Sequence, residues 1–225
     1  SPAIDAMGRL VVAQAADRVG VAHGCTLGGQ GGPGCRCRDM PTRRRDPDAR
    51  IAAMIDFKLR AARPADVPAI AGLVAELAEF EHLSHLLQLT PETLAPHLFG
   101  ERPVVEAVVA ELTADAHGSA GDAGRLVAYA LFFTNFSTFL AKPGLYLEDL
   151  YVQPAFRGAG IGKALLAHLG ALALARDYGR FEWSVLDWNE NAIRFYQGMG
   201  ATVMPEWRIC RVAGPALAAF APAPA

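Results

Sequence analysis

The stretch LYLEDLYVQPAFRGAGIGKAL, residues 145–165, decides the fold of this 225-residue chain. Its aliphatic and aromatic residues up to Val152 predict a strand, and Pro154 prevents ladder pairing beyond it. Three glycines then form a turn, and Lys163 begins a segment whose leucines recur at helical spacing. We therefore expect a strand, a tight glycine-rich turn and a helix in direct succession.

A glycine-rich turn between a strand and a helix N-terminus is typical of an anion site. Backbone N–H groups point outward there, and the helix dipole adds partial positive charge. The nucleotide-binding patterns Gly-x-Gly-x-x-Gly and Gly-x4-Gly-Lys-Ser/Thr do not match this turn. The pattern that is present is Arg157-x-x-Gly160-x-Gly162. Taken alone, it is also compatible with a plain tight turn.

This pattern resembles the pyrophosphate loop of the GNAT acetyltransferases, which bind acetyl-CoA. The strand LYLEDLYV before it and the later segment WNENAIRFYQGMGA, residues 188–201, are similar to the branch that acetylates spermidine, spermine or diamines. The resemblance extends over about residues 55–212. It implies an acetyl-CoA-dependent enzyme, with no metal, that acts as a cytoplasmic homodimer on a small cationic amine.

The order of the expected elements predicts an α/β (α+β) architecture. We expect strands at 55–62, 104–112, 125–134, 145–152, 181–186 and 201–212, and helices at 64–80, after Thr90, after Lys163 and at 189–199. With the resemblance, this order implies a GNAT fold: a mixed, mostly antiparallel, twisted sheet flanked by helices. Its central strands should splay where residues 150–152 meet the strand that ends near Leu186.

The chain divides into three parts. Residues 1–53 are rich in Gly, Pro and Arg without any period, so we expect a disordered extension, with Met54 as the natural start. A transit peptide and a zinc knuckle are alternatives, although no Cys-x-x-Cys pair exists. Residues 54–213 form the expected acetyltransferase domain, and residues 214–225 an Ala/Pro-rich frayed tail.

Composition excludes several classes of function. No apolar run is long enough to span a bilayer, and four cysteines without a signal peptide favour a reducing compartment. The net charge of −2 divides unevenly, because residues 1–53 carry +3 and the remainder −5. An acidic folded part argues against a nucleic-acid partner and favours a cationic ligand.

Acetyl transfer to an amine requires that the amine lose a proton and that the departing thiolate gain one. Glu148 matches the family's proposed base; the alternative is a structural carboxylate paired with an arginine. Since adjacent residues of a regular strand face opposite sides, we expect Asp149 to point away from Glu148, toward a remote ammonium or a partner chain. Tyr196 matches the family's general acid; the alternative is a core aromatic.

The remaining site residues follow from the resemblance. The cofactor is expected to pair with the strand, to place its pyrophosphate in the turn and to contact the next strand and helix: Leu150, Tyr151, Val152, Arg157, Gly158, Ala159, Gly160, Ile161, Gly162, Lys163, Glu182, Trp183, Ser184, Asn189, Glu190, Asn191 and Ala192. The amine substrate is expected to contact Phe80, Glu81, Glu148, Asp149, Trp188, Glu206 and Trp207. For Glu81, a solvated carboxylate at a helix end is an equal alternative.

Three functions fit these residues. The leading one is N-acetylation of a small polyamine or diamine. The second is N-acetylation of a lysine-like amino acid such as thialysine or ornithine, because VLDWN, residues 185–189, resembles that sub-branch. The absence of the acidic residue and tryptophan that polyamine enzymes often carry near Asn135 points the same way. The third is a CoA-binding sensor or interaction module without turnover, which would need neither Glu148 nor Tyr196.

Overall fold

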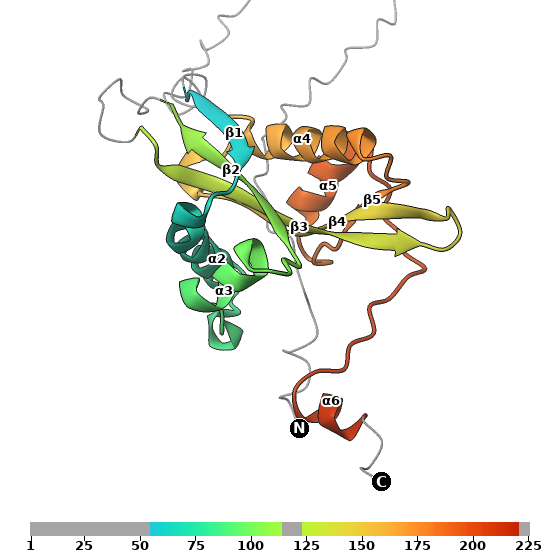
Figure 1. Cartoon of the computed structure of the whole chain (residues 1–225). Coiled ribbons are helices and arrows are strands. Elements are labelled where there is room, and N and C mark those ends of the chain that lie inside the picture. The colour runs from blue at the N-terminus through green and yellow to red at the C-terminus, as the bar shows by residue number, and fades with distance from the viewer. Residues whose placement is uncertain (1–54, 114–122, 221–225) are drawn as a thin grey trace, which may run out of the picture.

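The strand predicted from the deciding stretch is the fourth of a five-stranded sheet with the order β1-β2-β3-β4-β5 (Figure 1). The computed structural model describes residues 55–113 and 123–220. The expected extension 1–53, with its zinc and transit-peptide alternatives, lies outside the described residues, as does the proposed start at Met54.

The strands are β1 Phe57–Ala61, β2 Glu106–Leu112, β3 Leu126–Ser137, β4 Lys142–Val152 and β5 Phe181–Trp183. The α-helices are α2 Val67–Phe80, α3 Pro91–Phe99, α4 Ile161–Ala175, α5 Glu190–Gly198 and α6 Pro215–Ala219. Short 3-10 turns occupy Pro64–Asp66, Ser84–Leu86 and Pro154–Phe156. Most of these elements lie within a few residues of the predicted ones.

The sheet is mixed and mostly antiparallel, as predicted. β1 to β4 pair antiparallel in sequence order, and β5 adds to β4 in parallel. The β4–β5 ladder joins Leu145 with Phe181 and ends where Leu147 pairs with Trp183. Residues 148–152 of β4 continue beyond the last pair, so the two strands form a fork at that point. The expected splay is therefore confirmed, although β5 ends three residues before Leu186.

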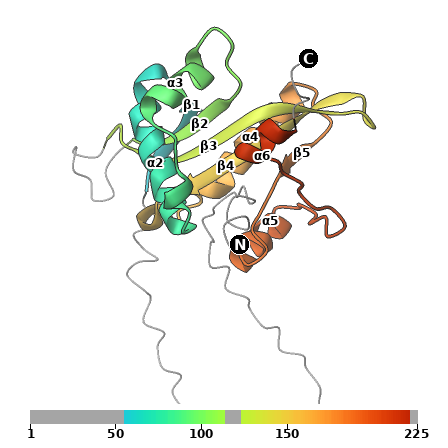
Figure 2. The same ribbon diagram turned by 90° about the horizontal axis from the view of Figure 1, so that it is seen from below.

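Helices cover both faces of the sheet and create two cores (Figure 1). The first, here called the α4-side core, joins α4 and α5 to one face through leucines such as Leu147, Leu150 and Leu165. The second, the α2-side core, joins α2 and α3 to the other face and includes Tyr129 and Tyr151. Seen from below, α2 and α3 lie at one end of the sheet, while the β3–β4 hairpin projects at the other (Figure 2).

Local sequence signals fix the ends of the helices on the α2 side. Thr90 caps α3 by accepting a hydrogen bond from the backbone N–H of Thr93, and Pro91 occupies the first helical position. The start of α2 is held instead by a side-chain contact from β1. Asp66 accepts two hydrogen bonds from the Arg60 guanidinium, at 2.6 and 2.9 Å. Arg60 also contacts Glu111, so one arginine ties β1, β2 and the entry to α2 together.

The predicted last strand, residues 201–212, is wrong. Residues 201–213 have no regular structure, and large apolar side chains such as Met204, Trp207 and Ile209 are exposed. A strand requires a neighbour for its ladder, and β5 ends at Trp183 without pairing to this segment. The expected frayed tail contains the short exposed helix α6, which stands away from the sheet (Figure 1). The expected homodimer stays a prediction.

Within the described residues, no helix combines the length and the apolar character needed to cross a membrane.

Candidate active site

A β-bulge at Glu148 shapes the centre of the sheet. Leu131 of β3 pairs with Asp149 and the next residue, Phe132, pairs with Leu147, so Glu148 is one extra residue in β4. The bulge reverses the alternation of the strand, and Leu147 and Leu150 therefore both reach the α4-side core. Glu148 and Asp149 consequently lie on the same face, the α2 side. The prediction that they face opposite sides is wrong, because it assumed a regular strand.

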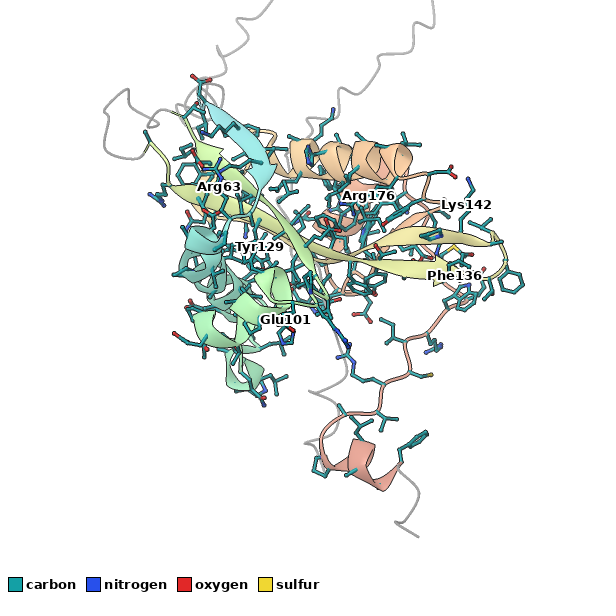
Figure 3. All side chains as sticks on the ribbon, in the orientation of Figure 1. Arg63, Glu101, Tyr129, Phe136, Lys142 and Arg176 are labelled. Carbon is teal, nitrogen blue, oxygen red and sulfur yellow. The ribbon has the colours of Figure 1, made fainter. Side chains whose placement is uncertain are left out.

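One further residue, Glu81, completes an acidic cluster on the α2 side, defined here as Glu81, Glu148 and Asp149. Glu81 follows the last residue of α2, and its Oε1 atom is buried without a hydrogen-bond partner. The fully buried Tyr129 of β3 directs its hydroxyl at Asp149, with an oxygen–oxygen distance of 3.5 Å. Figure 3 labels Tyr129 where β3 passes α2. Sequence reasoning missed Tyr129, since nothing distinguishes it from other apolar strand residues.

Burial and mutual repulsion make ionisation of the cluster unfavourable. Burial and, to a lesser extent, the charge of the neighbouring Glu148 together raise the pKa of Asp149 to about 7. Burial and the charge of Asp149 raise the pKa of Glu81 to about 8. The pKa of Glu148 is also raised by burial, against an opposing effect from the positive charge of Arg211. A cation bound here would favour the ionised carboxylates, so the cluster suits a cationic ligand.

Tyr196 lies on the opposite side of the sheet. It projects from α5 into the α4-side core, where its ring packs 4.9 Å from that of Trp183. Trp183 is the residue paired with Leu147 at the fork. The Tyr196 hydroxyl is buried without a hydrogen-bond partner, and burial holds its pKa well above the usual value for tyrosine. A buried hydroxyl without a partner is costly, which favours a role with a ligand over a plain core aromatic.

The glycine-rich turn has the backbone that an anion cradle needs. Gly158 and Gly160 adopt φ values of 84° and 80°, which disfavour any residue with a side chain. Gly160 is the N-cap of α4, and a Cβ atom built on it would meet nothing within 4 Å. A 15-residue helix begins directly after this glycine, and its first-turn N–H groups have no partner within the helix. The turn fits the pyrophosphate of acetyl-CoA.

Arg157 points back toward α2. Its Nε donates to the Val152 carbonyl at 3.0 Å, and its guanidinium stacks 4.9 Å from the Phe80 ring and 5.7 Å from the Tyr151 ring. Two residues assigned to different ligands, Arg157 to the cofactor and Phe80 to the amine, therefore contact each other. In this arrangement the contact between Arg157 and Phe80 connects the turn to the end of α2.

The other predicted residues are spread over the surroundings of the fork. Leu150, Tyr151 and Val152 are buried in the strand, Ile161 and Gly162 begin α4, and Lys163 is exposed.

Asn189 caps α5 by accepting from the N–H of Ala192 at 3.2 Å, while Glu190 and Asn191 contact Arg194. Glu182 bonds Asn135 and Arg180, Ser184 bonds Tyr146, and Ala159 packs on the α4-side core. Trp188, Glu206 and Trp207 are exposed.

The model of the acetyltransferase (GNAT) family matches residues 83–201. The chain belongs to this family. It is therefore an N-acetyltransferase, and the sensor without turnover is set aside. GNAT acetyltransferases use acetyl-CoA as the acetyl donor. Within residues 55–113 and 123–220, no group of three or more His, Cys, Asp or Glu side chains is placed to hold a metal ion.

Curated relatives of this acetyltransferase differ in the amines for which they are named. L-ornithine N5-acetyltransferase NATA1 of Arabidopsis thaliana is 36% identical over 72% of this chain and 87% of its own length. Thialysine N-epsilon-acetyltransferase of Mus musculus is 36% identical over 73% of this chain and 96% of its own. A human spermidine/spermine N(1)-acetyltransferase-like protein 1 is 32% identical over 68% of this chain but only 21% of its own.

Solved structures agree with the fold. An integron cassette protein from the mobile metagenome of V. cholerae superposes with a TM-score of 0.60 at 22% identity, over 74% of this chain and 98% of its own.

The turn yields the first prediction. Gly160→Asp should weaken acetyl-CoA binding by about tenfold or more, because it places a carboxylate at the helix N-terminus that would hold the pyrophosphate. Gly160→Asn is the matched control, since asparagine has the same size, tolerates positive φ and carries no charge. Calorimetry on the folded variants measures both affinities. Equal, wild-type affinity in the two variants would remove the turn from the cofactor site.

The acidic cluster yields a prediction on stability. The folded pKa of Asp149, about 7, exceeds the unfolded value of about 3.9, so its ionisation destabilises the folded state progressively as pH rises between these values. Asp149→Asn should therefore raise the melting temperature by roughly a few degrees more at pH 8 than at pH 5. Glu101→Gln, at an exposed loop position labelled in Figure 3, is the control. If Asp149→Asn raised the melting temperature equally at both pH values, the pKa of Asp149 would not be raised in the folded state.

Proposed function

We propose that this enzyme transfers the acetyl group of acetyl-CoA to the side-chain amine of a lysine-like amino acid, by direct attack of the amine. The observation that carries the proposal is the position of two candidate groups on opposite faces of one fork. Glu148 lies on the α2 side immediately after the last β4–β5 pair, and Tyr196 packs from the α4 side on Trp183 of that pair. A thioester carbon held in the fork would have a base on one face and an acid on the other.

We assign deprotonation of the amine to Glu148. A lysine-like amine has a pKa of about 10.4, so roughly one molecule in 2,500 is neutral at pH 7, a deficit of about 4.6 kcal/mol. The acidic cluster attracts the ammonium, and Glu148 accepts its proton directly or through water. Burial raises the pKa of Glu148, which makes the carboxylate a better proton acceptor. The neutral amine then presents its lone pair to the acetyl carbon.

Tyr196 serves the leaving group. Its phenol donates a proton to the thiolate sulfur, whose conjugate acid has a pKa of about 8.5, as the carbon–sulfur bond breaks. The unpaired, buried hydroxyl is consistent with a group that finds its partner only in the loaded enzyme. No covalent enzyme intermediate is needed, because the amine itself forms the new bond to carbon.

Two observations favour an amino acid as substrate. The relatives named for ornithine and thialysine are matched over most of their length, whereas the spermidine/spermine-like relative is matched over a fifth of its own. In addition, Arg211 lies within electrostatic range of Glu148, so the surroundings of the site include a positive charge as well as carboxyl groups. A small diamine is the second candidate, because three clustered carboxyl groups suit a ligand with two ammonium groups.

A substrate panel tests the proposal. Acetyl-CoA turnover would be measured with ornithine, thialysine, putrescine, spermidine and a basic peptide, at matched concentrations. We expect the highest kcat/KM for ornithine or thialysine. A higher value for putrescine or spermidine would establish the second candidate. Turnover of the peptide alone, or of none of the five, would overturn the proposed substrate class.

Two variants separate the roles of the acid and the base. Tyr196→Phe keeps the ring and its packing, so kcat should fall by roughly 10²–10⁴ while KM for both substrates changes little. Glu148→Gln should lower kcat, raise the KM of the amine, leave acetyl-CoA binding unchanged and flatten the rise of rate with pH. A Tyr196→Phe enzyme with wild-type kcat, measured while chemistry limits the rate, would show that Tyr196 is a core aromatic.

A further inference from the structure

A pair of hydroxyl groups lies at the fork, on the face of the acidic cluster. Tyr146 Oη and Ser184 Oγ are 2.8 Å apart and form a hydrogen bond across the end of the β4–β5 ladder. Leu145 and Leu147 point into the α4-side core, so Tyr146 between them points to the α2 side. Ser184 follows Trp183, whose ring packs in the α4-side core, and therefore also faces the α2 side.

Tyr146 is held on two sides. Its ring contacts that of Phe133, the residue directly opposite on β3, with centroids 5.1 Å apart. Its hydroxyl is fixed by Ser184. Tyr146 and Glu148 are two residues apart in β4, and both lie on the α2 side. A small polar group placed over this face can contact both side chains.

We propose that the Tyr146 hydroxyl, oriented by Ser184, accepts a hydrogen bond from the attacking amine and directs its lone pair toward the acetyl carbon. This inference rests on the proposed function. After Glu148 has taken one proton, the amine still carries two N–H bonds and one lone pair. Anchoring one N–H on Tyr146 leaves the lone pair free and limits rotation about the carbon–nitrogen bond.

The hydroxyl pair has the capacity for this contact. A phenol oxygen offers one donor and two acceptor positions, and the bond to Ser184 uses only one of the three. Whichever hydroxyl donates within the pair, Tyr146 keeps an acceptor position for an amine N–H. Tyr146 would thus touch the substrate, whereas Ser184 acts through Tyr146 as a positioning residue.

The chain offers a matched control. Thr134 Oγ1 and Tyr178 Oη form another hydroxyl pair, also at 2.8 Å. Tyr178 packs against the α4-side core, on the face away from the acidic cluster. Tyr178→Phe therefore removes a tyrosine hydroxyl from an equivalent hydrogen bond without reaching the amine.

The experiment compares steady-state kinetics and melting temperatures of five variants. Tyr146→Phe should lower kcat/KM for the amine by about tenfold, leave the KM of acetyl-CoA within about twofold, and keep the rise of rate with pH that Glu148 provides. Ser184→Ala should lower the same kcat/KM by about threefold, and Ser184→Thr should restore it. The double variant Tyr146→Phe/Ser184→Ala should be no slower than Tyr146→Phe alone, because Ser184 acts only through Tyr146. Tyr178→Phe should match the wild type in all these measurements.

Each contrary result overturns the inference. It fails if Tyr146→Phe behaves as Tyr178→Phe does, if the two losses add in the double variant, or if the KM of acetyl-CoA rises together with that of the amine. Should Tyr146→Phe not fold, the contrast between Ser184→Ala and Ser184→Thr, each changing one small side chain, decides in its place. A wild-type enzyme that acetylates no amine overturns the proposed function and this inference with it. A wild type that turns over with an insensitive Tyr146→Phe overturns this inference alone.

Discussion

The site depends on the end of one backbone ladder. β4 pairs with β5 only as far as Leu147, and residues 148–152 then keep β3 as their single strand neighbour. Backbone N–H and C=O groups at the centre of a sheet are rarely left without a partner. A linear ligand arm with amide groups can take the place of the missing strand. The end of the ladder therefore leaves β4 with backbone groups to which such an arm could bind.

The bulge at Glu148 determines what surrounds that point. A regular strand would direct one of two adjacent carboxylates into the α4-side core, where leucines would surround an ionised group at high cost. With one extra residue, both carboxylates turn to the α2 side, near Glu81 and Tyr129. The charge that remains unbalanced there destabilises the folded protein and at the same time creates attraction for a cation. Such a conflict between stability and ligand binding is common at functional sites.

Local sequence signals predicted most of the fold. The Thr90 cap, the glycines of the turn and the period of the leucines in α4 each depend on neighbours in the chain, and each is present as expected. Features that depend on a distant partner were missed. The bulge arises from the register of β4 against β3. The strand predicted at 201–212 does not form, because no strand among the described residues pairs with it. The direction of the Arg157 side chain also depends on a distant residue, Phe80.

The proposed division of roles, with Glu148 as base and Tyr196 as acid, also limits where substrate selectivity can arise. The reacting group is the same in every primary aliphatic amine: an ammonium that must lose a proton and then direct its lone pair at the acetyl carbon. As the proposed base, Glu148 would therefore act in the same way on lysine-like amino acids and on diamines. Discrimination must come from the far end of the substrate, where an amino acid carries a carboxylate and a diamine a second ammonium. The buried carboxyl groups of Glu81 and Asp149 favour the ammonium, while the charge of Arg211 favours the carboxylate. On the proposed function, the balance between these opposing charges, more than any group at the fork, would set which amine the enzyme accepts.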